Sequence, residues 1–455
     1  MPNSGRMGSH HLTTVAAKLA GVLLAATPIM ATAQAPSPQT TPPLSAAQSD
    51  PVRLGWMVGA PPPADKVIRF SDPDYFTFPK LRWTVCHFRQ LMPTLNVARG
   101  PGAPIPLARR LDAAIDAVSF TPMGSNQAMT WAQSLDANYT DGVVILHNGV
   151  VVYERYAGCL DEAGQHGAMS VTKSVTGLLG EILVAEGKLD ETARVGTLVP
   201  ELKDSAFGDA TIRQLLEMTT GLRYSEDYKD PNADVWTYSA AGNPLPKPEG
   251  YTGPNGYFEY LQTVRKAGEH GQAFGYRTIN TDALGWVITR VTRQSVATLL
   301  QTRLWSRMGA EQDAYYTVDS VGTPFAGGGL NLGLRDLARI GQLMLDDGVV
   351  NGRRLAPKAA IDRIRAGGDK AAFARSGYTD LKGWSYRGMW WITHNADGAY
   401  MARGVHGQSI YVDPAAHMVI ARFGSHPVAS NTANDATSLP AFQAVADHLM
   451  GLGPR

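Results

Sequence analysis

The sequence predicts an α+β fold: an antiparallel sheet, built from both ends of the chain and flanked by helices, with a mostly helical domain inserted between. Two observations predict the sheet. Asn148-Gly149 lies between two β-branched runs, which is the strongest short signature of a β-hairpin. Near the other end of the chain, Asp413-Pro414 separates two more strand-like runs. A third observation predicts the insertion, because helical periodicity and loops occupy residues from about 189 to 320.

Composition indicates a globular protein with room for two or three subdomains. Of its 455 residues, 44% are hydrophobic and 18% are charged. The net charge of +1 gives no electrostatic reason to expect nucleic acid or an acidic partner. The sequence does not predict an oligomeric state.

The first 35 residues have the layout of a secretory signal peptide. Arg6 and Lys18 precede an apolar run, and Ala33-Gln34-Ala35 fits a small-x-small cleavage site. The run is short for a transmembrane span, although an uncleaved anchor is the alternative. Residues 36–51 are rich in Pro, Ser, Thr and Gln and predict a flexible linker. We therefore expect an exported protein, periplasmic or secreted, that leaves the membrane once the signal is cleaved.

Residues 52–125 predict an irregular N-terminal arm laid over the main body, because their aromatic, proline and charged residues follow no clean period. The only two cysteines of the chain are Cys86 and Cys159. Export would permit a disulfide between them. Two free buried thiols are the alternative, since neither cysteine belongs to a Cys-x-x-Cys motif.

A main domain is expected over residues 126–455, with helices at about 129–138, 170–187, 282–291, 295–304, 335–346 and 439–450. Thr211-Ile212-Arg213-Gln214 predicts a capping box at the start of one more helix. Pro440 would occupy the first turn of the last helix, where proline is tolerated. The polar stretch at 224–257 reads as a long loop, and long loops in compact domains are often functional.

Ser170-Val171-Thr172-Lys173 supplies a candidate nucleophile and base. Residues three apart share a helix face, so the Ser170 hydroxyl can meet the Lys173 amine. A serine hydroxyl needs a base to take its proton. Lysine can be that base only where burial or a neighbouring cation lowers its pKa, and the apolar residues that follow predict burial. A single Ser-x-x-Lys match is common, so a surface lysine on an ordinary helix is the alternative.

Two further segments could complete this site. Tyr276 precedes a predicted helix, and a phenol beside a serine and a lysine can relay a proton to a leaving group. A half-buried core aromatic is the alternative for Tyr276, and a helix cap is the alternative for Asn280. In Gly404-Val405-His406-Gly407-Gln408, glycines that open a strand would let a substrate lie along the strand edge. A strand-edge amide and the Ser170 amide could then form an oxyanion hole, at about 3 kcal/mol per donor.

Together, these motifs resemble the serine β-lactamase and penicillin-binding-protein superfamily, and most closely its class C-like branch of esterases and 6-aminohexanoate-dimer hydrolases. The resemblance extends over about residues 141–449. The segments that carry it are 170–173, 210–216, 219–224, 276–278, 328–331, 335–339 and 405–414, and residues 82–89 of the arm are similar to the dimer-hydrolase subgroup.

The resemblance implies a β-lactamase-like fold and a set of roles. Ser170 would be the acylated nucleophile, Lys173 its base and Tyr276 the proton shuttle, while the amides of Ser170 and Gln408 would form the oxyanion hole. It implies no cofactor and no metal. The substrate would be a small ester or amide, because the subgroup typically cleaves short ω-amino-acid amides and simple esters.

Two departures from the β-lactamase pattern matter for the substrate. Thr278 stands in place of the Asn of Tyr-x-Asn, and Val405-His406-Gly407 stands in place of Lys-Thr-Gly. The lysine of that third motif helps to hold the β-lactam carboxylate, so its absence favours esters or linear amides. Substrate contacts are expected from seven residues: Tyr224, Asp227, Tyr228, Thr278, Asn280, His406 and Gly407.

Several other functions compete with this interpretation. One is β-lactamase or D-alanyl-D-alanine peptidase-like activity, and another is an acyl-binding sensor without turnover. A metal site is not predicted, because the four histidines between residues 394 and 426 form no His-x-x-x-His pair. The absence of a Gly-x-Ser-x-Gly elbow around Ser170 argues against an α/β-hydrolase. His406 as a conventional triad base is a further alternative, which Lys173 makes unnecessary.

Overall fold

A seven-stranded antiparallel sheet, in the order β13-β14-β15-β16-β17-β4-β5, forms the centre of the protein. β17 pairs with β4, with Met418 opposite His147 and Arg422 opposite Val143. The sheet is therefore built from both ends of the chain, as predicted. Its strands are β4 (Thr140–His147), β5 (Val150–Tyr156), β13 (Ser385–Arg387), β14 (Trp390–Ile392), β15 (Tyr400–Gly404), β16 (Gln408–Asp413) and β17 (Met418–Gly424).

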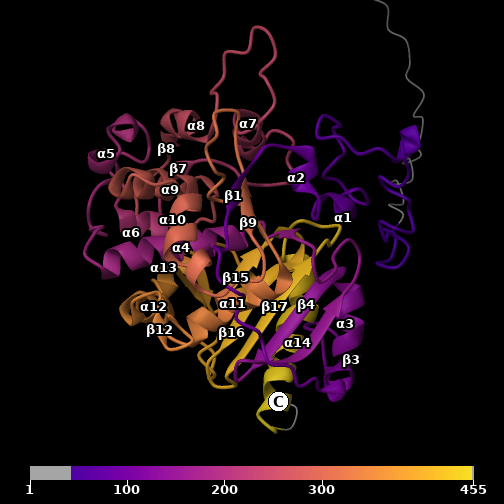
Figure 1. Ribbon diagram of the computed structural model, residues 1–455. Helices are drawn as coiled ribbons and strands as arrows, with labels where there is room; N and C mark the ends of the chain where they lie inside the picture. The colour runs from indigo at the N-terminus through magenta and orange to yellow at the C-terminus, as the bar shows by residue number, and fades with distance from the viewer. Residues whose placement is uncertain (1–41, 453–455) are drawn as a thin grey trace, which may run out of the picture. The chain divides into compact units, whose positions relative to one another are not determined.

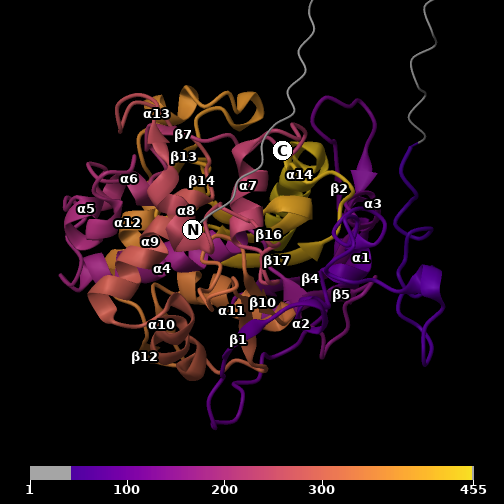
Figure 2. The same cartoon turned by 90° about the horizontal axis from the view of Figure 1, so that it is seen from above.

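Helices α11 (Leu334–Leu345) and α14 (Thr432–Leu449) cover opposite faces of this sheet. Side chains alternate between the faces of a strand. On β16, Ile410 faces α11, where a Cβ added to Gly341 would come within 2.8 Å of the Ile410 side chain. The next residue, Tyr411, packs its ring 5.3 Å from that of Phe442 on α14. Figure 2 shows the two helices on either side of β16 and β17. Both faces are buried, and the strands are accordingly apolar over most of their length, as at 143–146, 410–412 and 418–421.

The computed structural model describes residues 42–452, so the predicted signal peptide, residues 1–35, lies outside the described part. The described end of the predicted linker is not a free tether. Ser49 is buried, and its hydroxyl accepts a hydrogen bond of 3.0 Å from Arg82 Nη1. The Tyr139 hydroxyl donates to the carbonyl of Leu44 over 2.8 Å. Residues 44–51 are therefore docked on the main body.

The inserted region is mostly helical, as predicted, and Figure 1 shows its helices grouped beside the sheet. The predicted capping box is present, with reciprocal bonds between Thr211 and Gln214. The prediction of a loop over 224–257 was wrong in part, because helix α7 lies within this stretch. Its first residue, Asp234, accepts a hydrogen bond of 2.8 Å from the Ser225 amide at Oδ2. The helix that precedes the insertion is α4 (Val171–Ala185). The helices of the insertion are α5 (Val195–Leu198), α6 (Ile212–Leu216), α7 (Asp234–Ala241), α8 (Tyr257–Thr263), α9 (Ile279–Thr292) and α10 (Val296–Arg303).

α14 corrects another expectation, because it begins at Thr432 and places Pro440 in the helix interior. Proline lacks the N–H that would bond to the carbonyl four residues earlier. That carbonyl, of Ala436, instead accepts a bond of 2.9 Å from the amide of Met123 in the N-terminal arm. The helix continues past Pro440 because a distant segment supplies the missing donor.

A second, four-stranded sheet, β1-β9-β10-β6, connects the arm to the segment before Ser170. Its strands are β1 (Thr94–Val97), β9 (Ala314–Thr317), β10 (Leu330–Leu332) and β6 (His166–Gly167). Elsewhere the arm carries the short helices α1 (Leu81–Thr84) and α2 (Phe88–Leu91), and α3 (Trp131–Ala137) leads into β4. Helices α12 (Lys358–Arg365) and α13 (Lys370–Ala374) precede β13 in the chain.

Cys86 and Cys159 form a disulfide with a Cα–Cα distance of 6.0 Å, which decides between the two alternatives left open by the sequence. The bond joins the arm to the loop after β5 and spans 73 residues. Closing a loop of that length stabilises the fold by about 4 kcal/mol in the chain-entropy model. Among the described helices, none is both long and apolar enough to cross a membrane.

Candidate active site

Ser170 stands at the N-terminal end of α4, directly after a strained residue. Met169 has a φ of 46°, which is uncommon for a residue with a side chain. The short strand β6 and the Ala168 amide, which donates to Leu330 O over 2.8 Å, hold the entry to this turn. Such strain persists where the surroundings fix the backbone, and it is frequent at active sites.

Lys173, one turn along α4, points back toward this serine. Its Nζ lies 2.8 Å from Ser170 Oγ and 2.6 Å from the carbonyl oxygen of Gly327. The side chain is 1% exposed. The structure therefore brings the predicted nucleophile and base into hydrogen-bond contact in a site without solvent around the amine.

Burial lowers the pKa of Lys173 to about 8, while the charges of Glu226 and Asp282 act in the opposite direction. A free lysine would stay protonated across the physiological range. With the lowered pKa, a substantial fraction is the neutral amine near pH 8. This is the protonation state that a general base requires.

Asp282, on α9, was not singled out from the sequence, although it belongs to the same polar centre. It is buried, and its carboxylate accepts bonds from the Tyr238 hydroxyl at 2.6 Å and the Gly327 amide at 3.2 Å. Burial raises its pKa to about 7. Gly327 thus connects the two ionisable groups, with its carbonyl on Lys173 and its amide on Asp282. A side chain there would not fit, because its Cβ would lie 2.5 Å from Thr278 Cγ2.

Tyr276 lies on the other side of the lysine, just before α9. Lys173 Nζ is 5.2 Å from the centre of the Tyr276 ring. Burial raises the pKa of the Tyr276 hydroxyl, and a hydrogen bond with Ser170 lowers it in part. The Trp391 ring packs 5.5 Å from the tyrosine ring and holds it in place. All three predicted catalytic side chains therefore converge.

Glu226 is the second residue that the sequence analysis missed. Its carboxylate accepts bonds of 2.5 Å from both the amide and the hydroxyl of Thr278. It also accepts a bond of 2.8 Å from the Tyr228 hydroxyl. Glu226 therefore ties the loop after β7 (Leu222–Arg223) to the start of α9. In the sequence, only its position among the predicted substrate contacts Tyr224, Asp227 and Tyr228 pointed to a role for Glu226 in the site.

Tyr224, Asp227 and Tyr228, the predicted substrate contacts in this loop, have different surroundings. Tyr228 is 38% exposed, and its ring meets that of Trp236. Asp227 is also exposed, and its carboxylate accepts a bond from the Lys229 amide. Tyr224 is buried among other tyrosines, and its hydroxyl has no hydrogen-bond partner within residues 42–452.

Asn280 does not cap α9, which begins after Thr278. It lies inside the helix and is fully buried. Its Oδ1 accepts from the Thr220 hydroxyl over 2.6 Å, and its Nδ2 donates to Arg277 O over 3.3 Å. Asn280 thus connects α9 to residue 220, and a substrate contact from this residue stays a prediction.

The strand edge that meets Ser170 belongs to β15. A Cβ added to Gly404 would lie 3.0 Å from Ser170 N and 2.8 Å from Ala168 O. Gln408 is the β16 residue opposite Gly404, and its side chain bonds to Val405 O, Gly424 O and the Gly424 amide. Gly404 thus comes between Gln408 and the nucleophile. The glycine that permits this close approach is Gly404, the first glycine of the predicted motif.

His406 and Gly407 form the tight turn between β15 and β16, with φ values of 64° and 99°. The His406 ring is buried, its Nδ1 lies 2.7 Å from the carbonyl of His426, and burial lowers its pKa to about 4. A Cβ on Gly407 would meet Asn434, on α14. Both residues shape the hairpin that carries Gly404.

The histidines between residues 394 and 426 do not assemble into a metal site. Among residues 42–452, one group of three possible metal ligands lies close together, namely Cys86, Cys159 and His166. The two sulfur atoms in that group are bonded to each other. The group therefore offers no thiolate to a metal in the oxidised protein.

A cavity of about 350 Å³ opens beside Tyr276, lined by the loop after α13 and by the first turn of α14. Asp435 on α14 pairs with Arg403 of β15, and the Arg403 guanidinium lies 5.0 Å from the Trp391 ring centre. This cavity was not predicted, because the segments that line it, 275–276, 376–381 and 432–435, are far apart in the chain. The lining residues are Gly275, Tyr276, Ser376, Gly377, Tyr378, Thr379, Asp380, Leu381, Thr432 and Asp435.

Comparison with known proteins agrees with this fold and this geometry. The β-lactamase family model matches residues 133–438. The 6-aminohexanoate-dimer hydrolase of Paenarthrobacter ureafaciens is 34% identical over 351 residues, which cover 77% of this chain and 86% of that protein. A solved structure from Bacillus anthracis, which carries the name of a 6-aminohexanoate-dimer hydrolase, is 32% identical in sequence. It superposes with a TM-score of 0.77 over 86% of this chain and all of that one. A penicillin-binding-protein homologue from Caulobacter crescentus shares the fold at 15% identity and a TM-score of 0.54, over 75% of this chain and all of that one.

An antiparallel sheet flanked by helices, with a serine at the start of the helix beside it, defines an enzyme of the serine hydrolase superfamily. The chain belongs to the β-lactamase family. It is a serine hydrolase, and its relative from Paenarthrobacter ureafaciens is named a 6-aminohexanoate-dimer hydrolase.

Proposed function

We propose that the chain is an exported serine hydrolase that cleaves short esters or linear amides, of the 6-aminohexanoate-oligomer type, through an acyl-enzyme on Ser170. The observation that carries the proposal is the 2.8 Å contact between Lys173 Nζ and Ser170 Oγ in a site where the lysine pKa is lowered to about 8. The name of the relative from Paenarthrobacter ureafaciens supplies the substrate type.

In the proposed reaction, neutral Lys173 takes the proton of Ser170 as its Oγ attacks the substrate carbonyl carbon. The tetrahedral intermediate then collapses and the bond to the leaving group breaks. Tyr276 passes a proton from Lys173 to the departing oxygen or nitrogen. A water molecule then gives a proton to Lys173 and attacks the carbonyl of the acyl-enzyme ester. As the bond between the acyl carbon and Ser170 Oγ breaks, Lys173 returns that proton to Oγ, which releases the acid and restores Ser170.

The negative charge on the substrate oxygen needs two donors. The Ser170 amide is one. For the second we propose the β15 edge at Gly404 and Val405 in place of the Gln408 amide, because Gly404 is the residue packed against Ser170 N. Removing one such donor typically costs a factor of about 10² to 10³ in kcat.

The cavity beside Tyr276 is the proposed site of the leaving group, because the proton shuttle forms part of its wall. Its polar side chains suit a short polar or charged chain. Arg403 in β15 is already paired with Asp435, so it does not replace the lysine that holds a β-lactam carboxylate. This arrangement supports linear substrates over β-lactams.

Export is supported by the disulfide, since such bonds persist in oxidising compartments. Cell fractionation with a C-terminal tag provides the test. We expect the mature protein in the periplasm or medium, shortened at the N-terminus, and recovery of the full-length chain in the cytosol would contradict export.

The hydrolase proposal is tested by multiple-turnover release of p-nitrophenol from a short-chain p-nitrophenyl ester. Wild type should turn over steadily, and Ser170→Ala should lose turnover by at least about 10³-fold. The control is Ser239→Ala on α7, where the hydroxyl bonds to the Val235 carbonyl, and it should retain wild-type activity.

A panel then separates the substrate classes: a linear 6-aminohexanoate dimer, a chromogenic cephalosporin and a D-alanyl-D-alanine peptide. We expect hydrolysis of the linear amide. A single burst without turnover, in every assay, would identify an acyl-binding sensor and overturn the proposal.

A further inference from the structure

We propose that the N-terminal arm, fastened by the Cys86–Cys159 disulfide, positions both halves of the oxyanion hole, and that reduction of this disulfide lowers turnover at Ser170. The inference rests on the proposed function of the Ser170 site. It assigns to Phe88 and Phe76 the role of positioning residues, which act through the backbone that they support.

The first half of the oxyanion hole is the turn that presents the Ser170 amide, and the arm contacts it directly. The Gly167 amide donates to Val85 O over 2.8 Å. A Cβ added to Gly167 would lie 2.8 Å from Phe88 and 2.7 Å from Met169, so these side chains close over the turn. Met169, which holds the positive φ before Ser170, is buried in an apolar cluster with Leu81, Val85, Phe88 and Tyr315.

The second half is the β15 edge, and the same cluster supports it. Val405, which follows Gly404, packs against this cluster together with Phe76 of the arm. Phe76 also places its ring 5.5 Å from that of His406, edge to face, and 5.7 Å from that of Phe88. One group of arm side chains therefore lies under both Met169 and Val405.

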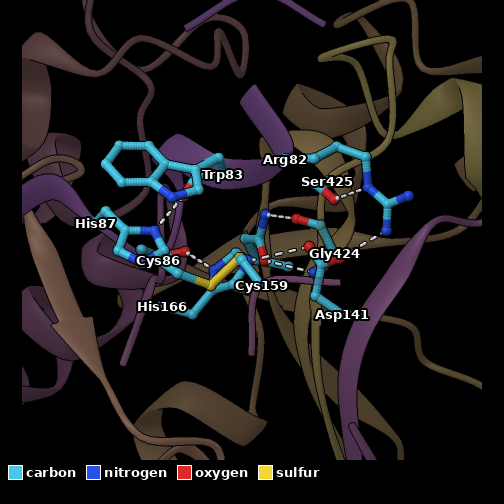
Figure 3. The surroundings of a disulfide bond; sticks show 11 residues. Arg82, Trp83, Cys86, His87, Asp141, Cys159, His166, Gly424 and Ser425 are labelled. Atoms are coloured by element: carbon cyan, nitrogen blue, oxygen red, sulfur yellow. Dashed lines mark hydrogen bonds and ion pairs between the residues drawn. A yellow bond between two sulfur atoms is a disulfide. The ribbon is translucent and has the colours of Figure 1, made fainter. Parts of the chain in front are cut away.

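The disulfide lies between the arm residues that make these contacts. Cys86 follows Val85 and stands two residues before Phe88, and both sulfurs belong to residues that pack against the cluster. Figure 3 shows the bond beside His166 of β6, with Arg82 reaching across to Asp141 and Ser425. Arg82 and Asp141 are both buried, so this ion pair attaches the arm to the main body in addition to the disulfide. Reduction would therefore loosen the arm locally and leave the main domain folded.

The redox step needs a dithiol as the reductant. One thiolate of the dithiol attacks a sulfur of the bond and displaces the other cysteine as a thiolate. The second thiolate of the reagent then resolves the mixed disulfide. Cys86 and Cys159 end as two thiols, having gained two electrons and two protons, and the reagent ends as a cyclic disulfide. Both cysteines are half-buried, so the reagent has a route to them.

The first test uses the full-length enzyme and the ester assay. Phe88→Ala should lower kcat about tenfold or more with KM within about twofold, because a small displacement of catalytic groups affects the transition state more than binding. Phe88→Leu should restore most of kcat. The control, Phe78→Ala, removes an arm ring that packs on Tyr139 outside the cluster, and it should match wild type. A folded Phe88→Ala enzyme with wild-type kcat would overturn the role of Phe88.

The second test uses dithiothreitol on wild type, with free thiols counted by alkylation and intact mass. Loss of kcat on reduction and its return on reoxidation would support the proposal. The variant Cys86→Ser with Cys159→Ser should have the low kcat from the outset and should not respond to the reagent. Unchanged kcat in protein that carries two alkylated thiols would overturn the redox role. Failure of the hydrolase proposal is distinguishable, since the oxidised wild type would then show no Ser170-dependent turnover.

Discussion

Lys173 Nζ lies 2.8 Å from Ser170 Oγ, so the amine that must receive the serine proton is already in contact with it. The same amine donates to the carbonyl oxygen of Gly327 over 2.6 Å. These two contacts fix the position of the amine, and the protonation state then decides the rate of acylation.

The pH dependence of kcat/KM should report this group. A general base acts in its neutral form, and the pKa of Lys173 is about 8. The rate should therefore rise about tenfold per pH unit below pH 8 and level off above it, as the ammonium loses its proton. The His406→Gln variant is the control. Since the pKa of His406 is lowered to about 4, this variant should keep the rise in kcat/KM that levels off near pH 8. If the variant lost this pH dependence, the histidine-base alternative would be restored.

Glu226→Gln should move the pH at which kcat/KM levels off to a lower value. The Glu226 charge favours the protonated amine and so raises the pKa of Lys173. Removing the charge removes this contribution, while the amide oxygen of Gln can still accept a bond from Thr278. Asp227→Asn is the matched control in the same loop, and it should shift this pH less. A shift to higher pH in the Glu226 variant would contradict this electrostatic account.

Lys173→Met should change the pH dependence of the free energy of unfolding. The folded pKa of about 8 lies below the ordinary value of 10.5, so the buried ammonium destabilises the native state. This penalty, about 3 kcal/mol by linkage, is full below pH 8, declines between pH 8 and 10.5, and is absent above.

The measurement is urea unfolding of wild type and Lys173→Met across pH 7 to 11. The stability of the variant relative to wild type should fall by about 3 kcal/mol over that range. Hydrogen bonds lost by the variant add a term that does not depend on pH. A constant difference would show that the lysine is not desolvated in the native state.

Tyr276→Phe should damage amide hydrolysis more than ester hydrolysis. An amine leaving group must be protonated as it departs, whereas p-nitrophenolate leaves readily as an anion. We expect a loss of about 10² to 10⁴ in kcat for a linear amide and a smaller loss for the ester. The phenylalanine ring retains the packing on Trp391, so the substitution removes the hydroxyl and leaves the fold unchanged. Equal losses on both substrates would remove Tyr276 as the proton donor.

Local sequence was sufficient for the parts of this protein that local chemistry decides. The Asn148-Gly149 turn forms its hairpin because both residues adopt positive φ. Ser170 and Lys173 meet because they are three positions apart at the start of one helix. The capping box of Thr211 and Gln214 likewise depends on four consecutive residues.

Features that depend on contacts between distant segments were missed or misplaced. Pro440 lies in mid-helix because Met123 supplies a donor to Ala436. We propose Gly404 and Val405 in place of Gln408 beside the nucleophile, because strand register, which the sequence does not specify, decides which residue approaches Ser170. Asp282 showed no signal beyond helical periodicity. Its place in the site depends on the Gly327 amide, which bonds to its carboxylate from a loop distant in the chain.

The pairing of β4 with β17 has a consequence for biosynthesis. β4 is among the first strands of the main domain to leave the ribosome, and its neighbour on one side is among the last. Until then its inner edge carries unpaired N–H and C=O groups, which can recruit other chains. Contacts of such sequence separation also form slowly. Nascent chains of this protein therefore need protection until synthesis is almost complete, and a premature stop codon before residue 418 would yield an aggregating product with no partially active enzyme.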